Sequence, residues 1–423
     1  MKKLIQTVII YSLISGAVSQ AQQLKQLTLN ECYTLARQNY PMVKQRELIA
    51  KTAAYNVENI QRGYLPQLSI NGQASYQSAV TEIPIKLPGA NVPTISKDQY
   101  KLYGEVNQVI YDGGVIGQQK ELQKTNEAVE QQKLETELYK LKERINQLFF
   151  GVLLLDEQLK QNELLIKDIQ LGLNKVQAAI NNGTALKSSG DVLRADILKN
   201  KQRSIELRAS RRAYTDMLAL FIGGTVDENA AFIRPQPVNV SAQINRPELL
   251  TYTEQNKNLD AQNNLISAKA LPKFSFYFQG GAGRPALNML SNNFDAFYIG
   301  GLRLSWSLSS LYTIKKDRAL IDIGRRNVDV QKETFLFNTN LTVKQQNAEI
   351  GKYEELLASD DEIIALRDKV KNTSVVQLEN GVITANDYLR EANAEEHARQ
   401  SKILHGIQLL LSQYNQQTTT GNL

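Results

Sequence analysis

The sequence is poor in cysteine, tryptophan, histidine and proline. Only one cysteine, one tryptophan, two histidines and ten prolines occur among its 423 residues. The single cysteine, Cys32, excludes an intramolecular disulfide, and its neighbours Leu29, Leu35 and Ala36 predict a small packed side chain. The scarcity of proline permits polar, heptad-like stretches that are far too long for a compact domain.

Catalytic and nucleotide-binding motifs are also missing. The sequence contains no nucleophile elbow, zinc-protease motif, phosphate loop or complete dinucleotide fingerprint. His397 and His405 lie about 12 Å apart along a helix, so a shared metal site is not expected. The sequence therefore indicates a protein that is not an enzyme and needs no cofactor.

Long apolar runs are confined to the N-terminus. Residues 1–21 predict a secretory signal peptide, with Lys2 and Lys3 before an apolar stretch of roughly 15 residues, whereas a membrane anchor needs about 20. Removal of the two lysines changes the formal net charge from +6 to +4. Acidic and basic residues are interleaved, so nucleic-acid binding is not implied, and the mature chain is expected to be exported.

A duplication is the main feature that the sequence does contain. Arg62-Gly-Tyr-Leu-Pro-Gln-Leu-Ser-Ile matches Ala268-Lys-Ala-Leu-Pro-Lys-Phe-Ser-Phe, 206 residues later. Asn181-Asn-Gly-Thr-Ala-Leu, followed by Asp191-Val-Leu-Arg, matches Glu379-Asn-Gly-Val-Ile-Thr, followed by Asp387-Tyr-Leu-Arg. The sequence therefore predicts two tandem repeats, 22–240 and 241–423, each with a helix, two strands and a long helical hairpin.

Four short segments alternate between apolar and polar residues. They cover about 66–77, 100–111, 273–282 and 297–308. Segments of about ten alternating residues fit membrane β-strands, although a half-buried soluble sheet shows the same pattern. Four strands cannot close a barrel, and lipid does not tolerate open strand edges, so several chains would have to share one barrel.

The helical segments favour the membrane interpretation. A helix is predicted over 28–63, ended by Leu65-Pro66, and a second runs without proline from about Gly117 to Asn181, a rod of roughly 100 Å. Another runs from about Lys315 to Glu379. Each long helix is followed by a glycine-centred turn and a returning helix, about 191–221 and 386–415, with apolar spacing that suits coiled-coil packing.

The whole mature sequence resembles the TolC-like outer-membrane efflux proteins of Gram-negative bacteria. The resemblance rests on Leu-Thr-Leu-Asn-Glu-Cys at 27–32, on the two Leu-Pro junctions, on Val109-Ile-Tyr-Asp-Gly-Gly114 and on the two Gly…Asp-x-Leu turns. It implies a mixed α/β membrane protein. A homotrimer would form a twelve-stranded β-barrel in outer-membrane lipid, four strands per chain, continuous with a long α-helical coiled-coil tunnel in the periplasm.

The resemblance also implies a function and partners. Members of the family are passive exit ducts of tripartite efflux pumps or type I secretion systems. They are joined through a periplasmic adaptor, a membrane fusion protein, to an inner-membrane RND or ABC transporter. The turns near 183 and 381 would be the periplasmic tips of the tunnel. The residues that match the adaptor-docking motif are Gly183, Thr184, Leu186, Gly381, Val382 and Thr384.

Asp191 and Asp387 match the family aspartates that narrow the tunnel mouth, although each could simply cap the returning helix. Arg194 and Arg390 stand where some members carry a second carboxylate, and we expect them to pair with nearby acids and hold the mouth shut. The first tip is also two residues longer than the second between its glycine and its aspartate.

A different class of protein stays open from the residues alone. It is an exported coiled-coil adaptor or adhesin-type structural protein without a membrane barrel. An adaptor would need only one helical hairpin and separate all-β modules, whereas this chain has two hairpins with strands between the helices. A periplasmic hydrolase, the third interpretation, has no catalytic constellation to support it.

Overall fold

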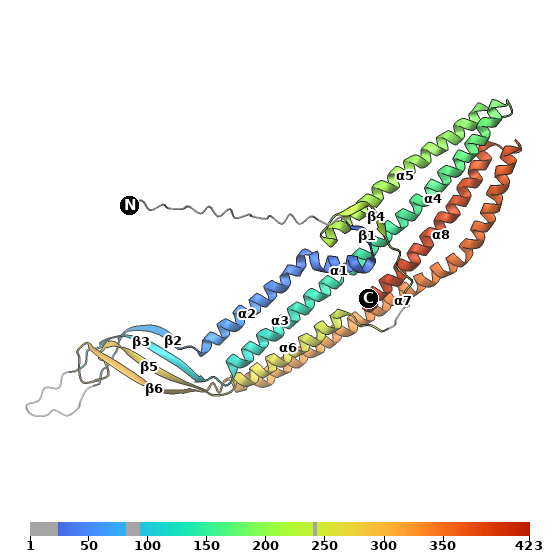
Figure 1. Ribbon diagram of the computed structural model, residues 1–423. Coiled ribbons are helices and arrows are strands. Elements are labelled where there is room, and N and C mark those ends of the chain that lie inside the picture. The colour runs from blue at the N-terminus through green and yellow to red at the C-terminus, as the bar shows by residue number, and fades with distance from the viewer. Residues whose placement is uncertain (1–23, 82–93, 240–242) are drawn as a thin grey trace, which may run out of the picture. The chain divides into compact units, whose positions relative to one another are not determined.

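A computed structural model of the chain describes residues 24–81, 94–239 and 243–423 (Figure 1). The predicted signal peptide and the predicted repeat boundary at 240/241 lie outside these ranges. The chain divides into two compact units. The tip unit combines Met1–Tyr40, Leu141–Val240 and Gln346–Gln416, and the sheet unit combines Pro41–Lys140, Ser241–Gln345 and Gln417–Leu423. Each unit therefore draws on both halves of the sequence.

The sheet unit contains one antiparallel sheet of four strands in the order β2-β3-β5-β6 (Figure 1). The strands are β2 (Gln67–Tyr76), β3 (Asp98–Tyr111), β5 (Lys273–Arg284) and β6 (Asp295–Ser305). The last strand ends earlier than the predicted 308, because Ser307 and Ser310 form a turn in which the Ser310 hydroxyl donates to the Ser307 carbonyl at 2.6 Å. Within the described chain the sheet is open, with β2 and β6 at its edges.

The strand register gives the sheet two different faces. Leu68 lies opposite Val106 and Val106 opposite Phe278, so these apolar side chains share one face. On the other face the Glu105 carboxylate accepts hydrogen bonds from Gln279 at 2.8 Å and from Arg303 at 3.1 Å. The apolar face is uncovered, since Leu68 is 78% exposed and Leu302 is 76% exposed.

Helices α2 (Gln45–Gln61), α3 (Val115–Tyr139) and α6 (Pro247–Lys269) complete the sheet unit, together with α7 (Ser310–Glu379) as far as residue 345. Helix α3 follows β3 directly because the Asp112 carboxylate accepts from the N–H groups of Gly114 and Ile116, at 2.8 and 2.6 Å. The predicted helix over 28–63 is interrupted. Pro41, which lacks an N–H group, opens a 3₁₀ turn (Pro41–Lys44) before α2.

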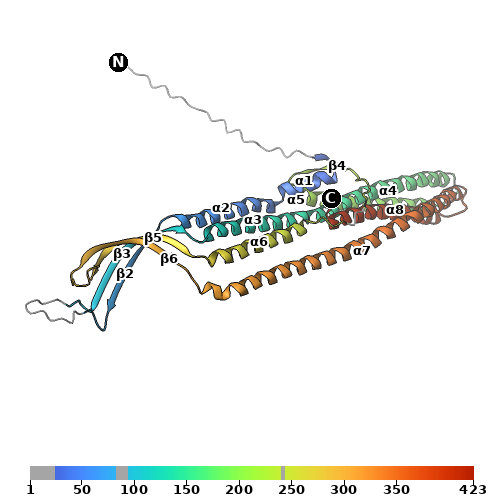
Figure 2. The ribbon, with the colours of Figure 1, turned by 90° about the horizontal axis from the view of Figure 1, so that it is seen from below.

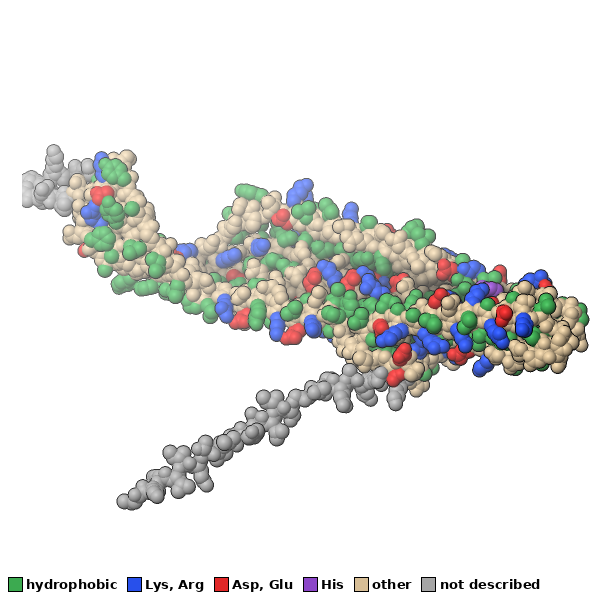
Figure 3. Space-filling model, turned by 90° about the horizontal axis from the view of Figure 1, so that it is seen from above, with side chains coloured by type: hydrophobic (Ala, Val, Ile, Leu, Met, Phe, Trp, Pro, Cys, Tyr) green, Lys and Arg blue, Asp and Glu red, His purple; other side chains and the backbone are tan. Residues whose placement is uncertain are grey.

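Helix α7 has apolar residues on two opposite sides in the sheet unit. Ile321 and Val328 are buried, and on the same side Gly324 packs against Leu259 of α6. The other side carries five apolar residues at steps of three, seven and four residues, each more than half exposed. We call them the α7 stripe: Leu320, Ile323, Val330, Phe337 and Leu341. Figure 3 shows that hydrophobic side chains are open to solvent on the face that it presents.

The tip unit is built from α1 (Leu29–Asn39), α4 (Leu141–Asn181), α5 (Lys187–Ile222), the rest of α7 and most of α8 (Ala385–Thr420). Strand β1 (Leu24–Leu27) pairs in parallel with β4 (Val226–Phe232), a pairing that the sequence did not predict. The predicted helix from Gly117 to Asn181 is also divided, because Lys140 separates α3 from α4.

The core of the tip unit joins three helices that Figure 2 shows side by side. Leu165, Ile169, Leu173 and Val176 of α4 pack with Leu193 and Ile197 of α5, and with Tyr388, Leu389 and Ala392 of α8. The two helical hairpins, one from each half of the sequence, thus share one core near their turns. No helix among the described residues is both long enough and apolar enough to cross a bilayer.

Candidate functional site

The turn between α4 and α5 is closed by backbone hydrogen bonds around Gly183. The Gly183 N–H donates to the Ile180 carbonyl at 3.0 Å, and the Thr184 N–H donates to the Ala179 carbonyl at 2.9 Å. This pair of bonds is a Schellman motif, in which the residue after the helix end must adopt a left-handed conformation. Gly183 has φ = +73°, and no heavy atom would lie within 4 Å of an added Cβ. Its conformation, and not a lack of space, requires glycine.

The turn between α7 and α8 repeats the same motif. Gly381 has φ = +67° and donates to the Leu378 carbonyl at 3.1 Å, while the Val382 N–H donates to the Gln377 carbonyl at 2.8 Å. The two matching sequence motifs therefore form matching turns, which we call the first and second tip turns. Both end a long helix with the same geometry.

The helices that return from the two turns begin differently. Helix α8 has a capping box: the Asp387 N–H donates to the Thr384 hydroxyl at 3.2 Å, and the Asp387 carboxylate accepts from the Thr384 N–H at 3.1 Å and from its hydroxyl at 2.7 Å. These bonds from Thr384 hold the pKa of Asp387 below its ordinary value. The N-cap position of α5 is Leu186, whose side chain makes no such bond and which is 74% exposed. Asp387 is thus a helix-capping residue.

The contacts of Asp191, Arg194 and Arg390 also differ between the two helical hairpins. Asp191 lies inside α5 and pairs with Arg194 at 3.3 Å, while Arg194 also donates to Gln177 of α4 at 3.0 Å. Arg194 therefore connects the two helices of the first hairpin. Arg390 pairs instead with its neighbour Glu391 at 3.1 Å, and it makes no ion pair with Asp387 in the described chain. Asp191, Arg194 and Arg390 are largely exposed, whereas Glu391 is not.

The two tip turns line a common cavity of about 430 Å³. Thr184 enters it from the first turn, and Gly381 and Thr384 enter it from the second. Lys175 of α4 and Glu379 of α7 form an ion pair at its wall. Leu186 does not line the cavity, and neither does Val382, which is 69% exposed. Three of the predicted docking residues, Thr184, Gly381 and Thr384, therefore share one groove with Lys175 and Glu379. Two others, Leu186 and Val382, expose apolar side chains outside it.

A partly buried charged cluster behind the tip turns was not predicted from the sequence. Lys371 of α7 donates to Asp168 of α4 at 3.0 Å and lies 3.6 Å from Glu395 of α8. Burial disfavours the charged lysine, but the bond to Asp168 and the charges of Asp168 and Glu395 outweigh it and raise the pKa of Lys371. These residues are far apart in sequence, so no spacing rule could have found them.

Comparisons with known proteins identify the fold. No family model matches the chain, and no curated protein sequence matches it. Solved structures do match. CusC, whose structures concern transmembrane channel formation, is 14% identical with a TM-score of 0.68, over 97% of this chain and 95% of that one. The outer-membrane protein VceC from Vibrio cholerae is 11% identical with a TM-score of 0.64, over 93% and 96%.

A third match is the open state of the outer-membrane channel MtrE from Neisseria gonorrhoeae, which is 13% identical with a TM-score of 0.62, over 93% of this chain and 88% of that one. At such identities the likeness concerns the fold, and it extends over nearly the whole length of each chain. The resemblance predicted from the sequence is therefore confirmed at the level of the fold, and this chain has the fold of the TolC-like outer-membrane channels.

Proposed function

We propose that this protein is an outer-membrane channel that passively conducts exported substrates from the periplasm to the exterior, and that it is not an enzyme. The observation that carries the proposal is the open sheet, which has an uncovered apolar face and a polar face. Leu68 and Leu302 on one face suit contact with lipid, whereas Glu105, Gln279 and Arg303 on the other suit contact with water.

Aromatic residues at both ends of the strands support a position in the membrane. Tyr76 and Tyr298 are 78% and 74% exposed near the ends of β2 and β6 that lead into loops. Trp306 and Tyr312 lie beyond the other end of β6 and are also exposed. Tyrosine and tryptophan gather where lipid meets water, so the apolar band between them would lie in the outer membrane.

Association of three chains would complete the sheet. Edge strands β2 and β6 would pair between neighbouring chains and close a barrel of twelve strands, since open edges are unstable in lipid. The α7 stripe supports the same homotrimer, because its spacing is that of a coiled-coil seam. The two tandem repeats, 22–240 and 241–423, would then place six helical hairpins around one periplasmic tunnel.

The tip turns would be the contact region for a periplasmic adaptor and, through it, for an inner-membrane RND or ABC transporter. The groove lined by Thr184, Gly381 and Thr384 suits an inserted helical segment, and Leu186 and Val382 offer apolar contacts beside it. Three copies of Asp191 and of Asp387 would converge at the mouth. We propose that Asp191 sets its charge selectivity while Asp387 chiefly caps α8, and that Arg194 braces the first hairpin.

Planar-bilayer recording of the purified protein tests the proposal. We expect single-channel conductance steps, each produced by one trimer. Native mass spectrometry of the same sample gives the oligomeric state. Asp191→Asn should weaken cation selectivity and leave trimers intact, and Asp196→Asn, on the same helix beyond the mouth, is the matched control. Stable monomers that never enter lipid bilayers would overturn the proposed channel function. They would favour the alternative interpretation, an exported adaptor or adhesin.

A further inference from the structure

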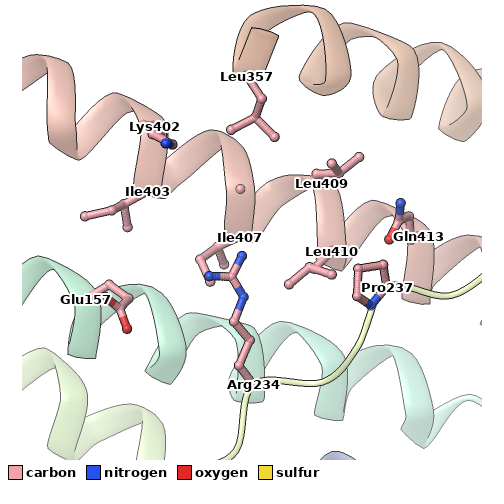
Figure 4. A pocket seen from close by; sticks show the side chains of 11 residues that line it. Glu157, Arg234, Pro237, Leu357, Lys402, Ile403, Ile407, Leu409, Leu410 and Gln413 are labelled. Carbon is pink, nitrogen blue, oxygen red and sulfur yellow. The ribbon is translucent and has the colours of Figure 1, made fainter. Parts of the chain in front are cut away.

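A second cavity lies in the tip unit between α8, α4, α7 and the linker that follows β4 (Figure 4). It belongs to neither tip turn. Its volume is about 300 Å³, at the lower end of the range for small-molecule sites. Most of its wall is apolar, and these lining residues are Pro237, Leu357, Ile403, Ile407, Leu409 and Leu410.

One cation, Arg234, extends from the linker into this apolar cavity. Figure 4 shows its side chain directed from the linker toward α8. A Cβ added to Gly406 would lie 3.5 Å from Nη2 of Arg234, so the guanidinium group lies over this glycine. Arg234 is exposed, and within the described ranges it makes no hydrogen bond or ion pair. Its charge is therefore free to meet a ligand.

The other charged residues at the cavity already have partners. Lys402 pairs with Asp361 of α7, and Glu157 pairs with Lys160 at 2.8 Å. The charge that the cavity leaves uncompensated is consequently positive. In addition, the buried Oε1 atom of Gln413 has no hydrogen-bond donor among the described residues, so a ligand hydroxyl or a water could donate to it.

We propose that this cavity binds a small amphipathic carboxylate. Its carboxylate would pair with Arg234, whose planar guanidinium matches two carboxylate oxygens at once. Its hydrocarbon body would lie against the apolar walls. The proposal concerns these helices alone and does not depend on the channel function.

Photolabelling of the purified full-length protein tests the site, with a decanoate that carries a diazirine on its chain. Mass spectrometry should locate the label on α8 between Ile403 and Leu410 and on Leu357. Unlabelled decanoate should compete, whereas decanol and acetate should not, since one lacks the charge and the other lacks the hydrocarbon body. Equal competition by decanol would overturn the proposal, because it would show that only the apolar walls matter.

Four variants separate binding from a loss of structure. Arg234→Gln should reduce labelling at the cavity about tenfold, the equivalent of one charge-assisted bond. Arg234→Lys should keep part of it, and Gly406→Leu should abolish it by filling the space. Arg208→Gln, an exposed arginine of α5, is the matched control and should change nothing. Undiminished labelling in Arg234→Gln, with circular dichroism like that of the wild type, would overturn the proposal.

Discussion

The ring of Tyr388 on α8 lies directly over Gly172 on α4. A Cβ on Gly172 would be 3.0 Å from Cε1 of Tyr388, which leaves no room for a larger residue without a shift. The Tyr388 hydroxyl donates to the Asp168 carbonyl of α4 at 3.2 Å, and burial raises its pKa to about 12. This pair joins the first helical hairpin to the second within the core of the tip unit.

We therefore expect Gly172→Leu to separate α4 from α8 and to destabilise the tip unit by about 1–3 kcal/mol, the usual cost of overpacking. Tyr388→Phe keeps the ring over the glycine and should cost only about 0.5–1.5 kcal/mol, from the lost hydrogen bond. Thermal unfolding followed by circular dichroism measures both. Gly351→Leu on α7 is the matched control, since no heavy atom would lie within 4 Å of its Cβ. Equal effects of the two leucine variants would contradict the contact.

The capping box of α8 predicts a pH dependence that α5 lacks. The folded-state pKa of Asp387 is lowered by Thr384, so its stabilising effect is present above the ordinary aspartate pKa and is lost as the pH falls through the lowered value. Asp387→Asn should increase amide exchange in the first turn of α8 at neutral pH and remove this dependence. Asp191→Asn should leave the first turn of α5 unchanged, because Asp191 caps nothing there. Identical protection in both helices would argue against the cap.

Glu396 on α8 predicts a pH dependence of stability with the opposite sign. Burial, reinforced by the charge of Glu395, raises its pKa, so the folded state favours the protonated acid. The contribution of Glu396 to the stability of the folded state should be most favourable below the ordinary glutamate pKa. It should decline as the pH rises through the raised pKa. Glu396→Gln should therefore raise the unfolding temperature at neutral pH and have little effect in mild acid. A loss of stability at neutral pH would show that the charged form is the better packed one.

The α7 stripe should control association. Ile323→Asp combined with Phe337→Asp places two charges on an apolar seam, and we expect the detergent-extracted protein to become monomeric. Light scattering coupled to size-exclusion chromatography gives the oligomeric state. Lys332→Asp adds an acid at an exposed position outside the stripe and should leave the oligomer unchanged. An intact oligomer in the double variant would place the interface on another surface.

Two adjacent residues test the orientation of β6. Leu304 lies on the apolar face and is 61% exposed, while Ser305 belongs to the polar face. Leu304 lies only two residues from the interfacial Trp306, so Leu304→Arg should cost up to about 1 kcal/mol and reduce the assembled protein, measured by refolding into lipid vesicles. Ser305→Arg should be tolerated. Equal tolerance of both changes would indicate a sheet that faces water on both sides.

Local chemistry explains what could be predicted from the sequence. Alternation along the strands places Leu68 and Ser69 on opposite faces, because successive side chains of a strand always point apart. Gly183 and Gly381 could be assigned to turns because a left-handed conformation favours glycine. Thr384 and Asp387 have the spacing of a capping box, and capping was one of the two roles open to Asp387.

Contacts between distant segments explain what could not be predicted. The pairing of β1 with β4 joins residues about 200 positions apart, and each strand is too short for a periodic signal. The ion pairs of Lys371 depend on Asp168 and Glu395, which lie on two other helices. The break at Lys140 contains neither proline nor glycine, so no local rule marks it.

The open sheet has a consequence for how the proposed channel would enter a membrane. The backbone N–H and C=O groups along the outer edges of β2 and β6 have no partner strand in the described chain, and hydrocarbon offers them none. If the proposed barrel forms, a single chain cannot insert first and find its neighbours afterwards. Association must precede insertion or coincide with it, so the rate of insertion should rise more steeply than in proportion to the chain concentration.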